Sequence, residues 1–272
     1  MPGLNEISPA HLMRLIGTPD CPVLIDVRLR EDIADAPRFV PTSVCLPHTD
    51  LPRIHNHITQ QNRSDRAVII CQKGKKLSFG VASWLRNLGV TAEVLSGGQF
   101  AWEAENLPQV PQSILQSTTS LWVTRHRPKI DRIACPWLIR RFVDPTAQFL
   151  FVPPAEVEAV AEKFAATAFD MPDGEWSHRG DLCTFDTMIS RFGLAHTALD
   201  RLAQVVRAAD TNRHDLSPQA AGLLAISTGL SRQYKDDTSQ LQAGLPIYDA
   251  LYRWARDAFA EGHDWPQSTG EK

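Results

Sequence analysis

Val68-Ile-Ile-Cys71-Gln-Lys-Gly74-Lys-Lys76 is the stretch that decides the fold of the first half of this chain. Apolar β-branched residues end at a cysteine, a glycine and lysines follow, and residues 77–88 have the apolar spacing of an amphipathic helix. The pattern predicts a strand, a tight loop and a helix start. Backbone N–H groups at a helix N-terminus lack intrahelical partners, so they stabilise an anion such as a thiolate. Cys71 is therefore the best nucleophile candidate.

Strands and helices are expected to alternate around this stretch. The patterns predict a helix at 8–16 and strands at 23–28, 43–46, 67–70 and 93–95. Such alternation indicates an α/β domain with a central, mostly parallel sheet flanked by helices. Ligands of such sheets bind beyond the carboxyl ends of the strands, where Cys71 is expected.

Composition excludes several classes of protein. Hydrophobic residues make up 43% and charged residues 22% of the 272 residues, which is typical of a globular protein with room for two domains. A net charge of −3 makes nucleic acid an unlikely partner. The five cysteines share no CxxC spacing, which argues against a disulfide framework or a thiolate zinc site. With no apolar leader and no membrane-length apolar run, we expect a cytoplasmic protein without a membrane partner.

The chain is expected to divide near residue 110. Residues 1–110 form the α/β domain, and residues 111–119, rich in Gln, Ser and Thr, indicate a linker. Residues 120–265 predict a second domain that is mainly helical and of the α+β class, with strands at 121–124, 148–152 and 168–170.

Three motifs of the first half resemble a rhodanese-like sulfurtransferase domain: Asp26-Val-Arg28, the loop from Cys71 to Lys76, and Gly97-Gly-Gln-Phe-Ala-Trp102. The resemblance implies that Cys71 carries a persulfide, taken from a small-molecule donor such as thiosulfate and passed to a thiol or other acceptor, with no cofactor. It also implies that the substrate anion is cradled by Gln72, Lys73, Gly74, Lys75 and Lys76. The family commonly has arginine where this chain has Lys76, which leaves the preferred donor open.

A cysteine phosphatase or an arsenate reductase is the rival interpretation of the same loop. Those enzymes need a loop one residue longer, with an arginine six positions after the cysteine. Leu77 stands there and offers no donor to a transferring phosphoryl group. Sulfur chemistry is therefore the better prediction.

The second half resembles the chromate-resistance domain of the ChrB type. The resemblance rests on residues 122–125, 129–145, 177–186 and 209–211. It implies a role in chromate resistance or its regulation and implies no particular reaction. We expect this domain to serve the sulfur transfer of the first half. Two alternatives are a sensor or regulator that responds to chromate or another oxyanion, and a metal-dependent redox enzyme.

Polar residues of the second half suggest two kinds of site. A divalent metal such as Mn, Fe or Zn is expected at His178, Asp181, Asp186 and Asp210. Alternatively, Arg125 and Arg132 could bind an oxyanion. The structural alternative is that the aspartates cap helices, because most of them fall near expected helix ends. Cys183 could accept sulfur from Cys71, although a packed thiol is the simpler interpretation.

Overall fold

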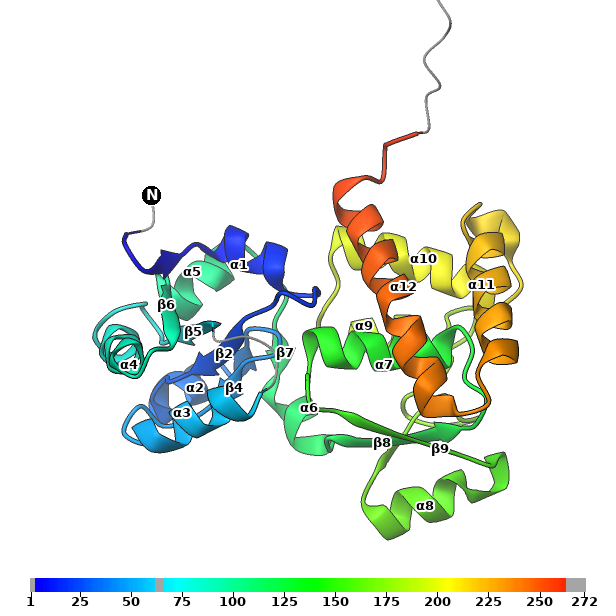
Figure 1. Cartoon of the computed structure of the whole chain (residues 1–272), viewed down its shortest axis with the longest axis horizontal. Coiled ribbons are helices and arrows are strands. Elements are labelled where there is room, and N and C mark those ends of the chain that lie inside the picture. The colour runs from blue at the N-terminus through cyan, green and yellow to red at the C-terminus, as the bar shows by residue number, and fades with distance from the viewer. Residues whose placement is uncertain (1–2, 62–65, 263–272) are drawn as a thin grey trace, which may run out of the picture.

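The computed structural model describes residues 3–61 and 66–262. These residues form two lobes that lie side by side (Figure 1). The expected end of the second domain at residue 265 lies outside the described residues. Among the described residues, none of the helices combines the length and the apolar character needed to cross a bilayer.

The first lobe is built on a parallel five-stranded sheet with the strand order β1-β6-β5-β2-β4. In chain order the strands are β1 (Glu6–Ile7), β2 (Val23–Asp26), β4 (Val44–Cys45), β5 (Arg66–Ile70) and β6 (Thr91–Leu95). Side chains of β2 and β5 alternate between two apolar layers, as the period of a strand requires. The α/β fold with a parallel sheet predicted for this half is confirmed.

Helices cover both faces of this sheet. They are α1 (Pro9–Leu15), α2 (Arg30–Asp35), α3 (Leu51–Gln60), α4 (Lys76–Asn87) and α5 (Gly98–Ala104). Apolar residues of α3 and α4 pack on one face, and those of α1 and α5 pack on the other. The helices expected at 8–16 and 77–88 are α1 and α4, whereas α2 and α3 were not predicted. Helix α3 has a clear N-terminal signal, because Asp50 caps it and a proline follows.

The segment predicted as a linker at 111–119 is structured. Strand β7 (Val110–Pro111) pairs antiparallel with β3 (Arg38–Phe39) of the first lobe, and helix α6 (Gln112–Ser117) follows directly. Pairing with β3 anchors the segment, and this contact cannot be read from its polar composition. The connection is therefore part of the packed structure.

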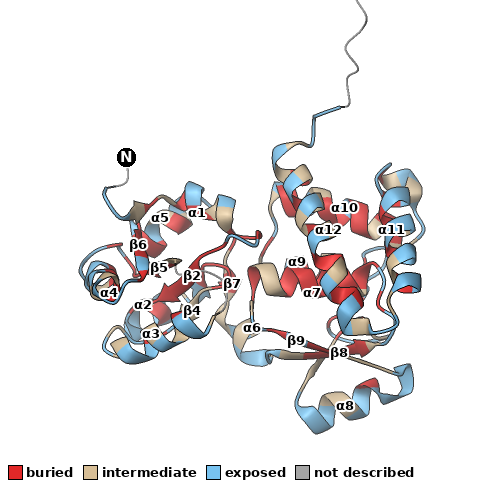
Figure 2. Cartoon of the chain, viewed as in Figure 1, coloured by how far each residue is buried: buried red, intermediate tan, exposed pale blue. Residues whose placement is uncertain are grey.

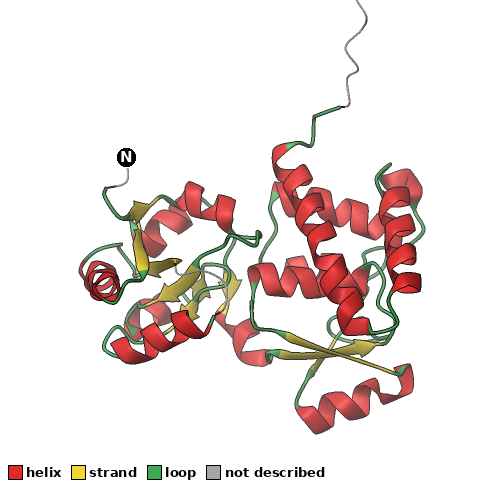
Figure 3. Cartoon of the chain, viewed as in Figure 1, coloured by secondary structure: helices red, strands yellow, loops and turns green. Residues whose placement is uncertain are grey.

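The second lobe contains a smaller parallel sheet with the order β10-β8-β9. Its strands are β8 (Leu121–Arg125), β9 (Gln148–Val152) and β10 (Thr167–Ala168). Helix α7 (Asp131–Phe142) connects β8 to β9, and helix α8 (Val157–Phe164) connects β9 to β10. The two helices lie on opposite sides of the strands (Figures 1 and 3). The chain thus reverses direction across the sheet between β8 and β10.

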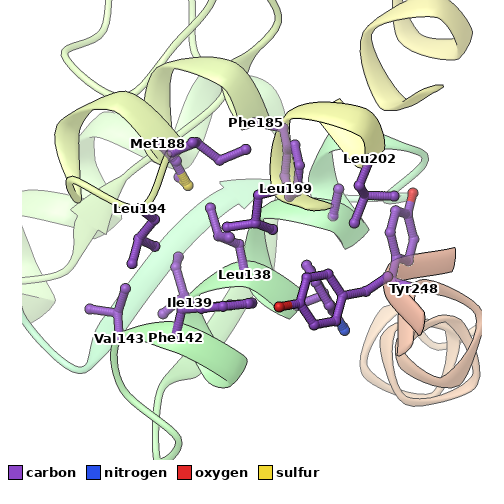
Figure 4. Close-up of a cluster of buried hydrophobic side chains, with 14 of the residues drawn as sticks. Leu138, Ile139, Phe142, Val143, Phe185, Met188, Leu194, Leu199, Leu202 and Tyr248 are labelled. Atoms are coloured by element: carbon purple, nitrogen blue, oxygen red, sulfur yellow. The ribbon is translucent and has the colours of Figure 1, made fainter. Parts of the chain in front are cut away.

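Helices make up the rest of this lobe, as predicted. They are η1 (Pro154–Glu156), α9 (Thr184–Arg191), α10 (Thr197–Asp210), η2 (His214–Leu216), α11 (Ala220–Gln233) and α12 (Asp237–Asp257). Helices α7, α9, α10 and α12 enclose an aromatic and aliphatic core (Figure 4). The last helix begins at Asp237 and continues through Pro246.

One apolar core extends through both lobes. Buried side chains of α1 and α5 belong to the same cluster as those of α7 and α12. Buried residues occur in the helices of both lobes (Figure 2). At the junction Gly17 has a φ of +81°, and a Cβ there would lie 2.4 Å from the Phe142 ring. The backbone N–H of Thr42 donates to the carbonyl of Phe142 at 3.1 Å. The lobes are therefore packed against each other rather than loosely tethered.

Candidate functional site

The Cys71 thiol lies where strand β5 ends and helix α4 is about to begin. The backbone N–H of Lys75 donates to Sγ of Cys71 at 3.3 Å, and Ser78 Oγ lies 3.1 Å from the same sulfur. Residue Cys71 is 4% exposed. The thiol is thus held in a fixed position, with a backbone donor aimed at it.

Two glycines close the loop against the start of α5. A Cβ on Gly98 would lie 2.1 Å from the carbonyl oxygen of Cys71, and a Cβ on Gly74 would lie 2.5 Å from the carbonyl of Leu95. Both residues have positive φ, which L side chains rarely adopt. The Cys71 carbonyl accepts a hydrogen bond from the N–H of Gln99 at 3.0 Å. The Gly97-Gly98 motif therefore shapes the cysteine loop, although it lies some 25 residues later.

The N-terminus of α4 suits a negative charge. Lys75, the N-cap residue, makes no side-chain capping bond to the helix. Lys73, Lys75 and Lys76 are exposed around the loop. The helix end and the three ammonium groups all favour an incoming anion. This arrangement is able to perform nucleophilic chemistry on an anionic donor.

A second cluster of ionisable groups lies in the other lobe, around the imidazole of His178. Its Nε2 atom lies 3.4 Å from Oδ2 of Asp131, 3.4 Å from Oδ1 of Asp170 and 3.3 Å from Oδ2 of Asp210. Asp131, Asp170 and His178 each offer one ligand atom within 4.8 Å of the others. Asp131 is the first residue of α7, Asp170 follows β10, and Asp210 ends α10.

Neighbouring groups hold these carboxylates in position. The N–H of Thr184 donates to Oδ2 of Asp131 at 2.7 Å, and its hydroxyl donates to Oδ1 of Asp170 at 3.0 Å. Oδ2 of Asp170 lies 2.8 Å from Arg125 and 3.3 Å from Arg132. The two arginines thus balance part of the negative charge.

The electrostatics of the cluster follow from burial and crowding. Burial raises the pKa of Asp131 to about 6, and the hydrogen bond to His178 opposes this rise. Burial alone would raise the pKa of Asp170, but hydrogen bonds from His178 and Arg125 hold it below the usual value. Hydrogen bonds to Asp131, Asp170 and Asp210 raise the pKa of His178 to about 12. The site therefore favours a positive charge at Nε2 of the imidazole.

Comparison with known protein families accounts for both lobes. Residues 8–105 match the rhodanese-like domain family, and residues 122–255 match the family described as ChrB, C-terminal domain. The chain joins a rhodanese-like domain to a ChrB C-terminal domain. It is also 31% identical over 160 residues to protein ChrB of Cupriavidus metallidurans, and the match covers 58% of this chain. That match spans 47% of the relative, about half its length.

Several solved structures are similar to part of this chain. A rhodanese-like domain protein from Staphylococcus aureus is 23% identical with a TM-score of 0.30, over 36% of this chain and 90% of its own. A rhodanese-related protein from Thermoplasma volcanium is 24% identical with a TM-score of 0.32, and the match covers 39% of this chain and 97% of that protein. A thiosulfate sulfurtransferase from Pseudomonas aeruginosa is 21% identical with a TM-score of 0.33, and the match covers 41% of this chain and 20% of that protein.

In the ChrB C-terminal domain, the structure brings together only part of the expected metal set. His178 and Asp210 meet, whereas Asp181 and Asp186 do not join them. Asp186 instead caps helix α9 by accepting from the N–H of Cys183 at 3.0 Å, and it pairs with Arg207. Asp181 is exposed and lines a separate cavity with Arg213. Asp131 and Asp170, which the predicted metal set did not include, lie beside His178 instead.

Other residues singled out in this domain have partners within it. The Arg125 and Arg132 side chains, expected to bind an oxyanion, both contact Asp170. Cys183 is fully buried and lies 3.2 Å from Asp186, and burial raises the pKa of its thiol well above the ordinary value. Cys135 is buried in the same way. Neither thiol is exposed to accept sulfur.

The Cys71 loop of the rhodanese-like domain is remote from the other domain. A cavity of about 300 Å³ between the domains is lined by the beginning of β2 and by residues such as Thr118 and Asp144. Cys71 follows the opposite, carboxyl end of β5, which pairs in register with β2. A strand of this length places the loop about 13 Å farther along the sheet. Helix α4 also lies on the side away from the ChrB C-terminal domain (Figure 1).

Proposed function

We propose that this protein is a sulfurtransferase that carries a persulfide on Cys71. The observation that carries the proposal is the Lys75 N–H that donates to Sγ of Cys71 at the uncapped N-terminus of α4. A thiolate at this position gains a hydrogen bond and the field of the helix, and both act on the sulfur itself. The rhodanese-like family of residues 8–105 supports the same chemistry.

The reaction has two displacement steps. In the first, the Cys71 thiolate attacks the sulfane sulfur of thiosulfate, forming the Cys71 persulfide and releasing sulfite. In the second, an acceptor nucleophile attacks the terminal sulfur, takes it and restores the thiolate. No net oxidant or cofactor is needed, because sulfite leaves with the electron pair of the broken bond. The lysines around the loop attract the anionic donor.

The sulfur acceptor is proposed to be a separate molecule. Cys135 and Cys183 are buried in the ChrB C-terminal domain, and the rhodanese loop faces away from that domain. A small thiol or a protein thiol that reaches the Cys71 loop from solvent fits this geometry. Internal transfer between the two domains does not.

Thiocyanate formation from thiosulfate and cyanide tests the proposal. The wild type should form thiocyanate, and its intact mass should rise by one sulfur atom after incubation with thiosulfate alone. Cys71→Ser should lose both signals. Cys45→Ser is the matched control, because Cys45 is exposed and lies in the same sheet, and it should retain both. Equal output from Cys71→Ser, or a wild type that gains no sulfur from thiosulfate or another persulfide donor, contradicts the proposal.

We further propose that this chemistry serves chromate resistance, because residues 122–255 belong to the ChrB C-terminal domain family. A chromate-sensitive bacterial host that expresses the wild type should survive a higher chromate concentration than one carrying an empty vector. Survival of the same host carrying Cys71→Ser or His178→Ala shows which domain provides the resistance. Equal survival with the empty vector and the wild type argues against the link.

A further inference from the structure

The His178 cluster lies where parallel α/β sheets bind ligands. In the strand order β10-β8-β9, the chain moves from the central strand β8 to the edge strand β9. It then crosses back to the opposite edge strand β10. Such a reversal opens a crevice at the carboxyl ends of the two strands beside it. Asp131 follows β8 and Asp170 follows β10, so both carboxylates lie at the end of the sheet where such a crevice is expected. The topology therefore points to a ligand between them.

The hydrogen bonding inside the cluster is incomplete without a ligand. Nε2 of His178 has one N–H at most, yet carboxylate oxygens of three aspartates lie 3.3–3.4 Å from it. A well-formed N–H···O bond measures about 2.9 Å, and one proton can serve only one of the three well. Oδ1 of Asp131 has no hydrogen-bond partner, although the residue is 1% exposed. A buried carboxylate oxygen without a partner is costly unless a cation sits beside it.

The spacing of the same atoms fits a metal ion. Two ligand atoms of a tetrahedral Zn²⁺ site, with bonds of about 2.0–2.1 Å, lie about 3.4 Å apart. Both Asp131 Oδ2 and Asp170 Oδ1 lie 3.4 Å from Nε2 of His178. Well-aligned hydrogen bonds are shorter, at about 2.9 Å. The distances are thus those of ligands that share an ion.

We propose that Asp131, Asp170 and His178 bind a divalent transition metal ion, with Zn²⁺ as the best fit. Imidazole together with carboxylates suits Zn²⁺, Fe²⁺ and Mn²⁺. Thr184 orients both buried carboxylates through its N–H and its hydroxyl, and Arg125 fixes the outer oxygen of Asp170. Supporting bonds of this kind are typical of metal sites.

One side of the site is open to solvent. The His178 side chain is 40% exposed and that of Asp210 is 19% exposed, whereas that of Asp131 is 2% exposed. The two positive charges of Arg125 and Arg132, both beside Asp170, stand against the three negative charges of Asp131, Asp170 and Asp210, so a bound divalent ion would leave an excess of one positive charge. The open side therefore suits a water molecule, a hydroxide or an anionic oxygen ligand. Three protein ligands with an open position are typical of catalytic rather than structural sites.

Metal titration of the full chain, purified without a histidine tag and stripped with a chelator, tests the site. The wild type should bind one Zn²⁺ in calorimetry, and Co²⁺ should give visible absorption bands that Zn²⁺ abolishes. Asp131→Asn and His178→Ala should each weaken binding by at least about a hundredfold. Both variants should fold, because asparagine has the size of aspartate and His178 is partly exposed; circular dichroism checks this.

Asp181→Asn and His214→Ala are the matched controls. Both residues lie in the same domain and outside the cluster, so both variants should bind like the wild type. If none of Zn²⁺, Co²⁺ and Mn²⁺ binds with a stoichiometry of one, the proposal is wrong. It is equally wrong if folded Asp131→Asn and His178→Ala bind as tightly as the controls. The outcome is independent of sulfur transfer, which needs only Cys71.

Discussion

The Cys71 loop and the His178 cluster are built in opposite ways. The loop is local: the thiol, its backbone donor at Lys75 and its neighbour Ser78 fall within eight residues of one strand, loop and helix. The cluster draws Asp131, Asp170, His178 and Asp210 from distant segments. A local site depends on the geometry of its own loop, whereas an assembled site depends on the packing of the whole domain.

The largest expected effect is a clean separation of the two sites. Cys71→Ser should abolish thiocyanate formation and leave Zn²⁺ affinity within about twofold, because the residues that contact Cys71 and those that contact His178 in the described structure are different and mutations at distant sites act independently. His178→Ala should abolish metal binding and leave the sulfur-transfer rate equally unchanged. Both assays on both variants measure this. A variant that loses both functions would mean that the sites are coupled.

The loop itself should depend on one remote glycine. Gly98→Ala places a Cβ 2.1 Å from the Cys71 carbonyl at a φ of +63°, so it should destabilise the protein by at least about 3 kcal/mol. It should also slow sulfur transfer. Urea unfolding measures the stability. Gly80→Ala is the control: its Cβ meets nothing within 4 Å in helix α4, so a gain of about 0.5–1 kcal/mol is expected. Equal stability of the two variants would refute the packing role of Gly98.

The ChrB C-terminal domain should also be sensitive to acid through His196. Burial, followed by the charge of Arg256, lowers the pKa of His196 to about 4 from its ordinary 6.5. The unfolded chain therefore binds the proton more readily, so stability is full above pH 6.5 and falls as the pH drops toward 4. This group should cost about 2.5 kcal/mol at pH 4.5 relative to pH 7.

His196→Asn isolates this effect, because an asparagine oxygen can still cap helix α10 as His196 Nδ1 does. Urea unfolding at both pH values should show a smaller loss for the variant than for the wild type. The same loss in both proteins would assign the acid sensitivity to other groups.

The smallest effect is expected from Ser78→Ala. The Ser78 hydroxyl lies 3.1 Å from the sulfur and donates to the Lys75 carbonyl at 3.0 Å, so it can turn to support a thiolate. Loss of one such bond should lower kcat by about tenfold with little change in the unfolding midpoint. Ser83→Ala, on the exposed side of the same helix, should leave kcat unchanged. An unaltered kcat in Ser78→Ala would show that the hydroxyl only packs.

The local site could be predicted from sequence, and the assembled site only in part. The strand before Cys71 and the helix after it follow from apolar spacing, and the structure contains both as β5 and α4. The contact between Gly98 and the Cys71 carbonyl could not be derived from spacing, because it joins two loops through the sheet. Whether Cys71 transfers sulfur stays a prediction.

In the second half, part of the predicted metal set was wrong because some of its aspartates have local structural roles. Asp186 stands three residues after Cys183 in a capping-box spacing, and this signal could have assigned it to the helix end. Asp131 and Asp170 each follow a strand, so the rule for carboxyl ends could have selected them. The distances among these residues depend on the order β10-β8-β9, which no single segment specifies.

The apolar core that extends through both lobes has a consequence for how the halves can be separated. Leu12, Ile16 and Trp102 pack in the same cluster as Trp137 and Tyr252, so cutting the chain after residue 119 would expose apolar surface on both fragments. Each fragment on its own should aggregate or need its counterpart to refold. Separation of the gene into two parts would therefore be harder here than in proteins whose domains are joined by a flexible linker, so the two domains should be inherited as one unit.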